Sequence, residues 1–447
     1  MHGPDVSIRG RRVVTPEGVR EACIHVSDGT IRRVAPFDDP PPGVPLVDAG
    51  ERVILPGLVD THVHVNEPGR TQWEGFETAT RAAAAGGVTT ILDMPLNSIP
   101  ATTTPEALAE KRSAAEAKVH VDVGFWGGAV PDDLGDLRGL HEAGVFGFKS
   151  FLCPSGVDEF EPLDLERLRD AMAEIAAFEG LLIVHAELPG PIERATARLT
   201  GADPYAYGTY LASRPSEAEE RAIAAVVEGS AATGCRTHVL HLSAASGLDR
   251  VGVPQGLVSV ETCPHYLTFD AEEISRGAVE YKCAPPIRDA ENRERLWEGL
   301  RRGVIAGVVS DHSPCTPDLK AGSFFEAWGG IASVQLGLRA VWTQARRRGF
   351  GLDDLALWMS AGPAAIAGLR RKGAIEEGRD ADLVVFEPDD SSLVEPSELH
   401  HRNPVTPYAG RRLDGRVTAT YVRGVEVYSD GRFLDAPAGR LLSRGAA

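Results

Sequence analysis

Residues 53–311 alternate short apolar runs with Ala-rich stretches, and this alternation most limits the folds open to the chain. The apolar runs have the length and β-branched content of buried strands, and the stretches between them favour helix. We place eight candidate strands at 53–65, 88–94, 119–127, 145–152, 181–186, 237–243, 257–263 and 304–311. Eight strand–helix units in one run predict an α/β protein with a (β/α)8 TIM barrel, whose active site forms at the carboxyl ends of its strands.

Shorter strand patterns flank this region on both sides. Residues 5–49 have the pattern of short strands joined by turns, and strand patterns return near the C-terminus in DLVVFEP, RVTATYVRG and VEVYSDGR. We therefore predict a small β-sandwich domain formed by residues 1–51 and 376–447. The barrel of residues 52–375 would be inserted between its two halves. Within the barrel, Ser216 and Glu219 have the spacing of a capping box at a helix start.

The composition excludes several classes of partner. A net charge of -18 argues against nucleic acid or an anionic membrane, since both need a positive surface. No apolar run is long enough to span a bilayer, and the first residues lack the apolar core of a signal peptide. The six cysteines are scattered without a CxxC pair, which is typical of free thiols in a reducing cytoplasm. We expect a cytoplasmic protein that acts on a small molecule.

Polar residues that are improbable in a core gather at the ends of the predicted strands. Side chains alternate along a strand, so His62 and His64 lie on one face at the end of the first strand. Each polar residue alone has an ordinary explanation as a hydrogen-bonding histidine or a capping aspartate. Together, at one end of one barrel, they suit two divalent ions such as zinc. The candidate ligands are His62, His64, Lys149, His185, His241 and Asp311.

Lys149 needs a separate argument, because an ammonium group cannot bind a cation. Phe148 and Phe151 flank it, and a desolvated amine favours the uncharged form. A neutral amine can add carbon dioxide to give a carbamate, an anion whose two oxygens could bridge two metal ions. The alternative is a lysine whose amine extends out of the strand into solvent to meet an acidic partner. The other five residues favour the carbamate.

With these residues in view, the chain resembles the cyclic amidohydrolases of the amidohydrolase superfamily, and within them the allantoinases. The resemblance is carried by PGLVDTHVHVNEPGR, WEGFETATRAAAAGGVTTILDMPLNS, FKSFLCPSGVDEF, VHAE, HLSAA, ETCPHYLTF, KCAPPIR and VVSDHSPC. It implies two divalent ions, Zn²⁺ or else Co²⁺ or Mn²⁺, CO₂ for lysine carboxylation, and a homotetramer or dimer. The ordered set of segments covers nearly the whole barrel.

The resemblance also implies a place for each ligand. His62 and His64 would hold the more buried ion with Asp311, His185 and His241 would hold the second ion, and Lys149, as N6-carboxylysine, would bridge both. A water shared by two ions has a lowered pKa. Asp311 would act as the catalytic base that passes the water's proton to the departing ring nitrogen. For allantoin, this reaction opens the hydantoin ring to allantoate in purine catabolism.

Related enzymes share such a centre, so the substrate must be argued from the pocket. Dihydroorotases are similar but carry an arginine, an asparagine and a histidine where this chain has Asn66, Ala284 and Cys315. The loss of these carboxylate-binding groups favours an uncharged ureide. The resemblance implies that Asn97 and Ser313, together with Asn66, contact the substrate, although an asparagine in a turn or a capping serine would explain the first two equally well.

Two further alternatives stay open. Hydantoinases and dihydropyrimidinases place a tyrosine shortly after the bridging lysine, and residues 150–158 contain none. The group that would stabilise the oxyanion in this chain is therefore unidentified. Some members of the superfamily are non-catalytic scaffolds that have lost metal ligands, and the complete ligand set here argues against that class.

Overall fold

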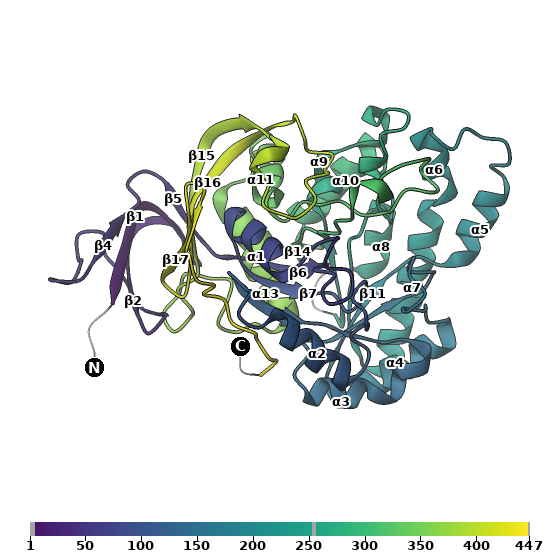
Figure 1. Ribbon diagram of the computed structural model, residues 1–447, viewed down its shortest axis with the longest axis horizontal. Coiled ribbons are helices and arrows are strands. Elements are labelled where there is room, and N and C mark those ends of the chain that lie inside the picture. The colour runs from purple at the N-terminus through teal and green to yellow at the C-terminus, as the bar shows by residue number, and fades with distance from the viewer. Residues whose placement is uncertain (1–4, 253–255, 446–447) are drawn as a thin grey trace.

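The computed structural model describes residues 5–252 and 256–445. Figure 1 shows parallel strands and their surrounding helices on one side of the molecule and a largely antiparallel sheet on the other. Each of the eight predicted strand ranges overlaps at least one observed strand, although most observed strands are shorter than predicted. None of the described helices combines the length and the apolar character that a membrane crossing requires.

Two parallel sheets hold the predicted barrel strands. The smaller sheet has the order β6 (Leu58–Val63), β7 (Val88–Asp93) and β8 (Asp122–Phe125). The larger sheet has the order β14 (Gly307–Val308), β13 (Val258–Thr262), β12 (Arg236–Val239), β11 (Leu181–His185), β10 (Phe148–Phe151) and β9 (Gly127–Gly128).

The two sheets meet at both edges. At one edge, β8 and β9 are separated only by Trp126, whose amide donates to the carbonyl of Asp93 over 3.0 Å. At the other edge, Val63 forms a parallel bridge with His312, and the amide of His64 donates to the carbonyl of His312 over 2.8 Å. All the strands therefore run in one direction, and their carboxyl ends lie on the same side.

The predicted strand 53–65 is wrong as a single element, because the chain changes sheets at Gly57. β5 (Val53–Pro56) pairs with strands of the antiparallel sheet, whereas β6 begins the parallel one. The Gly57 amide donates to the carbonyl of Asp382 over 2.8 Å. A Cβ atom at this position would lie 2.3 Å from Thr89 Oγ1, so the crossing point has no room for a side chain.

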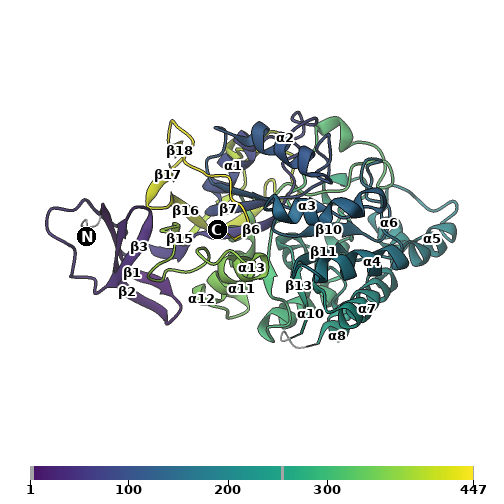
Figure 2. The same cartoon turned by 90° about the horizontal axis from the view of Figure 1, so that it is seen from below.

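Strands from both ends of the chain share the largely antiparallel sheet. Its order is β18 (Arg432–Phe433), β17 (Val425–Ser429), β16 (Arg412–Val422), β15 (Leu383–Leu393), β5, β1 (Val6–Thr15), β2 (Gly18–Ser27) and β3 (Thr30–Ala35), with β4 (Leu46–Asp48) paired to β1. Figures 1 and 2 show the purple N-terminal strands beside the yellow-green C-terminal strands. β15 runs antiparallel to β5 with Val385 opposite Ile54, and both side chains lie in a core separate from that of the parallel strands.

Amphipathic helices cover the parallel strands. In α4 (Leu165–Ala176), Leu168, Ala171, Met172 and Ile175 are buried at helical spacing, and the Asp164 side chain caps the first turn. The remaining helices are α1 (Phe76–Ala85), α2 (Pro105–Ala115), α3 (Leu137–Glu142), α5 (Pro189–Ala197), α6 (Tyr207–Ser213), α7 (Ser216–Thr233), α8 (Leu248–Val251), α9 (Pro264–Thr268), α10 (Ala290–Arg301), α11 (Gly337–Arg347), α12 (Leu352–Ala356) and α13 (Gly362–Ala367).

The capping box predicted at Ser216 is wrong. Pro215 occupies the position before α7, and no side chain caps this helix. The Glu219 carboxylate is buried and accepts hydrogen bonds from the amides of Ser243 and Ala244, so a tertiary contact takes the place of the local one. The prediction that all six cysteines are free thiols is confirmed, and all six are buried.

Candidate metal centre

The six predicted ligands line one cavity of about 460 Å³ at the carboxyl ends of the parallel strands. His62, Lys149 and His185 belong to strands β6, β10 and β11, and the other three follow shortly after strand ends. The cavity wall contains His62, His64, Lys149, His185, His241 and Asp311. Residues separated by up to 249 positions in sequence are thus brought to one place by the parallel arrangement of strands.

His62, His64 and Asp311 form the first group of converging atoms. Asp311 Oδ1 lies 3.1 Å from His62 Nε2 and 3.5 Å from His64 Nε2. The other ring nitrogen of His62 lies 2.9 Å from Glu261, a buried carboxylate on β13. That contact fixes the proton on Nδ1 and turns the Nε2 lone pair toward Asp311.

His185 and His241 form the second group. His185 Nδ1 lies 3.0 Å from His241 Nε2, which is close to the spacing of about 3.3 Å expected for two tetrahedral zinc ligands with Zn–N bonds of about 2.0–2.1 Å. His185 Nε2 contacts the Glu187 carboxylate at 2.8 Å. Since Glu187 accepts that proton, Nδ1 is the nitrogen left free for a cation.

Burial keeps these histidines neutral. Desolvation lowers the pKa of His62 and His241 well below the ordinary value, and that of His185 less strongly. The His62 Nε2 atom is buried without a hydrogen-bond partner among the described residues. A neutral, unpartnered imidazole nitrogen beside a carboxylate is the donor set that borderline divalent ions prefer, so the residues present fit such an ion.

Lys149 lines the cavity and is shielded from bulk solvent. Its side chain is 1% exposed, and its Nζ lies 4.6 Å from the centre of the Phe151 ring. Desolvation lowers the pKa of Lys149 to about 7, against the opposing charges of Asp311 and Glu261. The alternative in which the amine reaches solvent therefore does not hold. A substantial neutral fraction at physiological pH is what carbamate formation requires.

Two of the candidate ligands occupy strained backbone positions. His241 and Asp311 have φ values of 36° and 46°, in the left-handed region that residues other than glycine rarely adopt. Such conformations persist only where the surrounding structure holds them, and they are common at functional sites. Both residues follow strand ends, so the strain turns their side chains into the cavity.

The structure brings two of the three predicted substrate-binding residues to the cavity. Asn97 and Ser313 line it, and Asn97 Nδ2 lies 3.3 Å from His64 Nδ1. Asn97 also has a φ of 68°, so the expectation of a turn residue holds as well. Asn66 is not among the described lining residues, and its Nδ2 donates to the carbonyl of Pro314 over 3.4 Å. The role of Asn66 as a substrate-binding residue therefore stays a prediction.

Sequence reasoning missed the carboxylates that orient the histidines and the basic groups on the wall. Glu187 lies two residues after His185, the spacing that places strand side chains on one face, and this was the available signal. Glu261 likewise lies on a predicted strand. Arg214 and Lys282 also line the cavity. Lys282 opens the segment KCAPPIR, whereas no local pattern marks Arg214.

Comparison with known proteins agrees with this geometry. The model of the amidohydrolase family matches residues 53–427. An allantoinase of Streptomyces avermitilis is 56% identical, covering 99% of this chain and 100% of its own, and an allantoinase of Arabidopsis thaliana is 43% identical over 97% and 90%. Among solved structures, an L-hydantoinase (dihydropyrimidinase) from Arthrobacter aurescens has a TM-score of 0.94 and 31% identity over 98% of this chain and 100% of that one. The chain therefore belongs to the amidohydrolase family.

Proposed function

We infer that this chain is an allantoinase, a hydrolase that opens the hydantoin ring of allantoin to give allantoate in purine catabolism. The convergence of six buried donors on one cavity is the observation that carries the proposal. The relatives named allantoinase cover nearly the whole chain and are more similar in sequence than the hydantoinase neighbour. A cyclic amide is therefore the substrate class.

We propose that the cavity holds two divalent ions, zinc before Co²⁺ or Mn²⁺. His62, His64 and Asp311 would hold one ion, and His185 and His241 the other. Lys149, once its amine has added CO₂ and released a proton, would supply oxygens to both. When bound, the ions supply a water of lowered pKa and polarise the ring carbonyl.

Asp311 is the residue we assign to proton transfer. Its Oδ1 faces the centre of the cavity, because it lies 3.1 Å from His62 Nε2. From this position the carboxylate can accept the proton of the attacking water and deliver it to the ring nitrogen as the amide C–N bond breaks. Asn97 and Ser313 would hold the ring by hydrogen bonds to its amide groups.

We further propose the architecture that this function requires. The parallel strands of residues 52–375 would form a closed (β/α)8 barrel, an interpretation supported by the contacts at both edges of the two sheets. Residues 1–51 and 376–447 would form the small β-sandwich domain. The free, buried cysteines support a cytoplasmic location, and the resemblance supports a homotetramer or dimer.

A substrate panel on purified, metal-loaded protein tests the assignment. Allantoin, dihydroorotate, hydantoin and dihydrouracil would be compared by kcat/KM. We expect allantoin to be hydrolysed fastest, because the relatives named allantoinase are more similar in sequence than the hydantoinase neighbour. Faster turnover of dihydroorotate would overturn the substrate assignment, and faster turnover of hydantoin or dihydrouracil would favour the hydantoinase alternative.

A further inference from the structure

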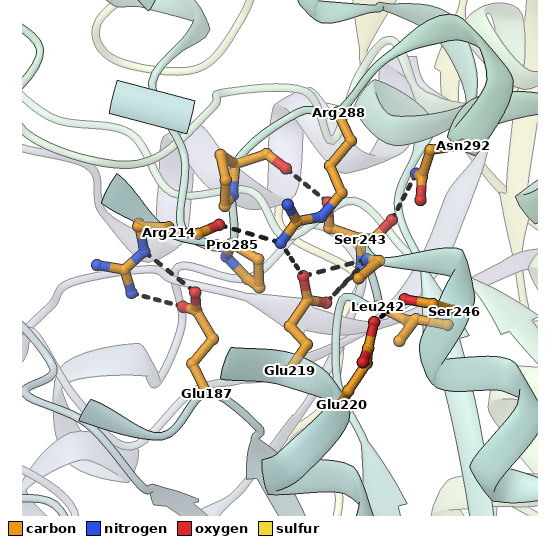
Figure 3. Close-up of polar contacts among 12 residues, drawn as sticks. Glu187, Arg214, Glu219, Glu220, Leu242, Ser243, Ser246, Pro285, Arg288 and Asn292 are labelled. Carbon is orange, nitrogen blue, oxygen red and sulfur yellow. Dashed lines mark hydrogen bonds and ion pairs between the residues drawn. The ribbon is translucent and has the colours of Figure 1, made fainter. Parts of the chain in front are cut away.

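Four charged side chains form two neighbouring ion pairs (Figure 3), one of which contacts His185. One pair joins Glu187 to Arg214, and the other joins Glu219 to Arg288. The two carboxylates and Arg288 are buried, and the Arg214 side chain is 19% exposed where it lines the cavity. Buried ion pairs are costly to desolvate, so their presence here calls for a role beyond stability.

The first pair fixes the orientation of His185. Arg214 contacts both oxygens of Glu187, through Nε at 3.1 Å and through its second guanidinium nitrogen at 2.5 Å. Glu187 in turn accepts the Nε2 proton of His185. A bidentate arginine holds a carboxylate in one plane, so the imidazole is held with Nδ1 facing His241.

The second pair fixes the chain that leaves His241. Glu219 accepts from the amide of Ser243 at 3.0 Å and from the amide of Ala244 at 3.0 and 3.1 Å. These amides lie two and three residues after His241, whose backbone is strained. The carboxylate therefore anchors the turn that keeps His241 aimed into the cavity.

Arg288 joins the two pairs. One of its terminal nitrogens lies 2.6 Å from Glu219 and 3.3 Å from the backbone carbonyl of Arg214. Figure 3 shows this guanidinium above Glu219, between the main chain of Arg214 and Ser243. Arg288 thus contacts Glu219, which anchors the turn after His241. It also contacts Arg214, which holds Glu187 against His185.

We propose that Arg288 is a positioning residue that sets the spacing of His185 and His241. Arg288 is not among the described residues that line the cavity and is not one of the six candidate ligands, and it acts through Glu219 and the main chain of Arg214. This inference rests on the proposed metal centre, in which these two histidines hold the second ion. Without Arg288, Glu219 is left as a buried carboxylate without a cation, and the turn after His241 loses its anchor.

The test is a zinc titration of metal-free protein in competition with a chromophoric chelator. In the Arg288→Met variant, the dissociation constant of one zinc equivalent is expected to rise 10–100-fold, the range typical of lost outer-shell partners. The other equivalent, held by His62, His64 and Asp311, is expected to keep its affinity. Arg288→Lys should restore part of the loss, because an ammonium group keeps the charge but not the planar geometry.

Two controls separate positioning from folding. Arg194→Met removes an exposed ion pair of 3.2 Å with Glu217 and should leave both zinc equivalents unchanged. Glu219→Gln keeps the shape of the side chain and should weaken the same single equivalent if Arg288→Met does not fold. Equal weakening of both equivalents, or of neither, in a folded variant would overturn the positioning role. Absence of zinc binding in the unsubstituted protein would instead overturn the metal centre.

Discussion

The orientation of two histidine rings determines which of their nitrogen atoms can bind a cation in the cavity. His62 and His185 each give one nitrogen to a buried carboxylate, Glu261 and Glu187 respectively, and this leaves the other nitrogen facing the cavity. The convergence of the six candidate ligands on one cavity could be predicted from sequence, because histidine, lysine and aspartate are rare at buried strand ends. Their orienting partners could not, because a glutamate on a strand has many possible neighbours. Arg288 ends the segment KCAPPIR, but its role could not be predicted from sequence, since its partners lie 69 and 74 residues away.

The ionisation of Glu187 is expected to make the free energy of unfolding depend on pH. The charge of Arg214 and the hydrogen bond from His185 outweigh desolvation and hold the pKa of Glu187 at about 2, below the ordinary 4.5. Stability from this ionisation is therefore present above pH 4.5 and is lost as the pH falls toward 2. The Glu187→Gln variant of the metal-free protein should be less stable by about 3 kcal/mol above pH 4.5.

Urea denaturation at a series of pH values measures this difference. The difference in unfolding free energy between the variant and the unsubstituted protein should become smaller as the pH falls, because the glutamate becomes protonated. A gap that stays constant from pH 6 to pH 3 would show that the Glu187 charge is not held by Arg214 and His185.

At the scale of the element, the sequence located strands better than it located their ends. Hydrophobic runs mark where strands lie, but a continuous run cannot reveal that the chain changes sheets within it. The run at 53–65 does so at Gly57, and only the packing of Thr89 and Asp382 against that glycine explains the break. The left-handed backbone of Asp311 was equally beyond reach, because no residue pattern encodes it.

Gly57→Ala tests the packing at this crossing point. The added methyl group would meet Thr89 Oγ1 at 2.3 Å and the Asp382 Cβ at 2.8 Å, so the two sheets must shift apart. We expect a loss of about 1–3 kcal/mol in unfolding free energy, measured by urea denaturation. The control is Gly208→Ala in α6, where a Cβ meets nothing within 4 Å. If the two variants were equally stable, the crossing would not be crowded.

At the scale of the whole molecule, the chain ends are tied to the parallel strands by a buried charge cluster. Lys372 Nζ lies 2.6 Å from Asp122 on β8 and 2.7 Å from Asp382, which precedes β15. In the antiparallel sheet, β15 from the C-terminal part of the chain pairs with β5 from the N-terminal part. The cluster was not foreseen, because its members are separated by up to 260 residues in the sequence.

The proposal that six side chains hold two divalent ions is tested most directly by counting the metal ions bound per chain. Elemental analysis of the purified protein and of the Lys149→Ala variant gives this number. The account predicts two divalent ions in the unsubstituted protein. The Lys149→Ala variant is expected to lose its bound metal and its hydrolysis of allantoin. Adding a small carboxylic acid, which can take the place of the carbamate, should restore part of the activity. A Lys149→Ala protein that keeps two ions and full activity would contradict the account.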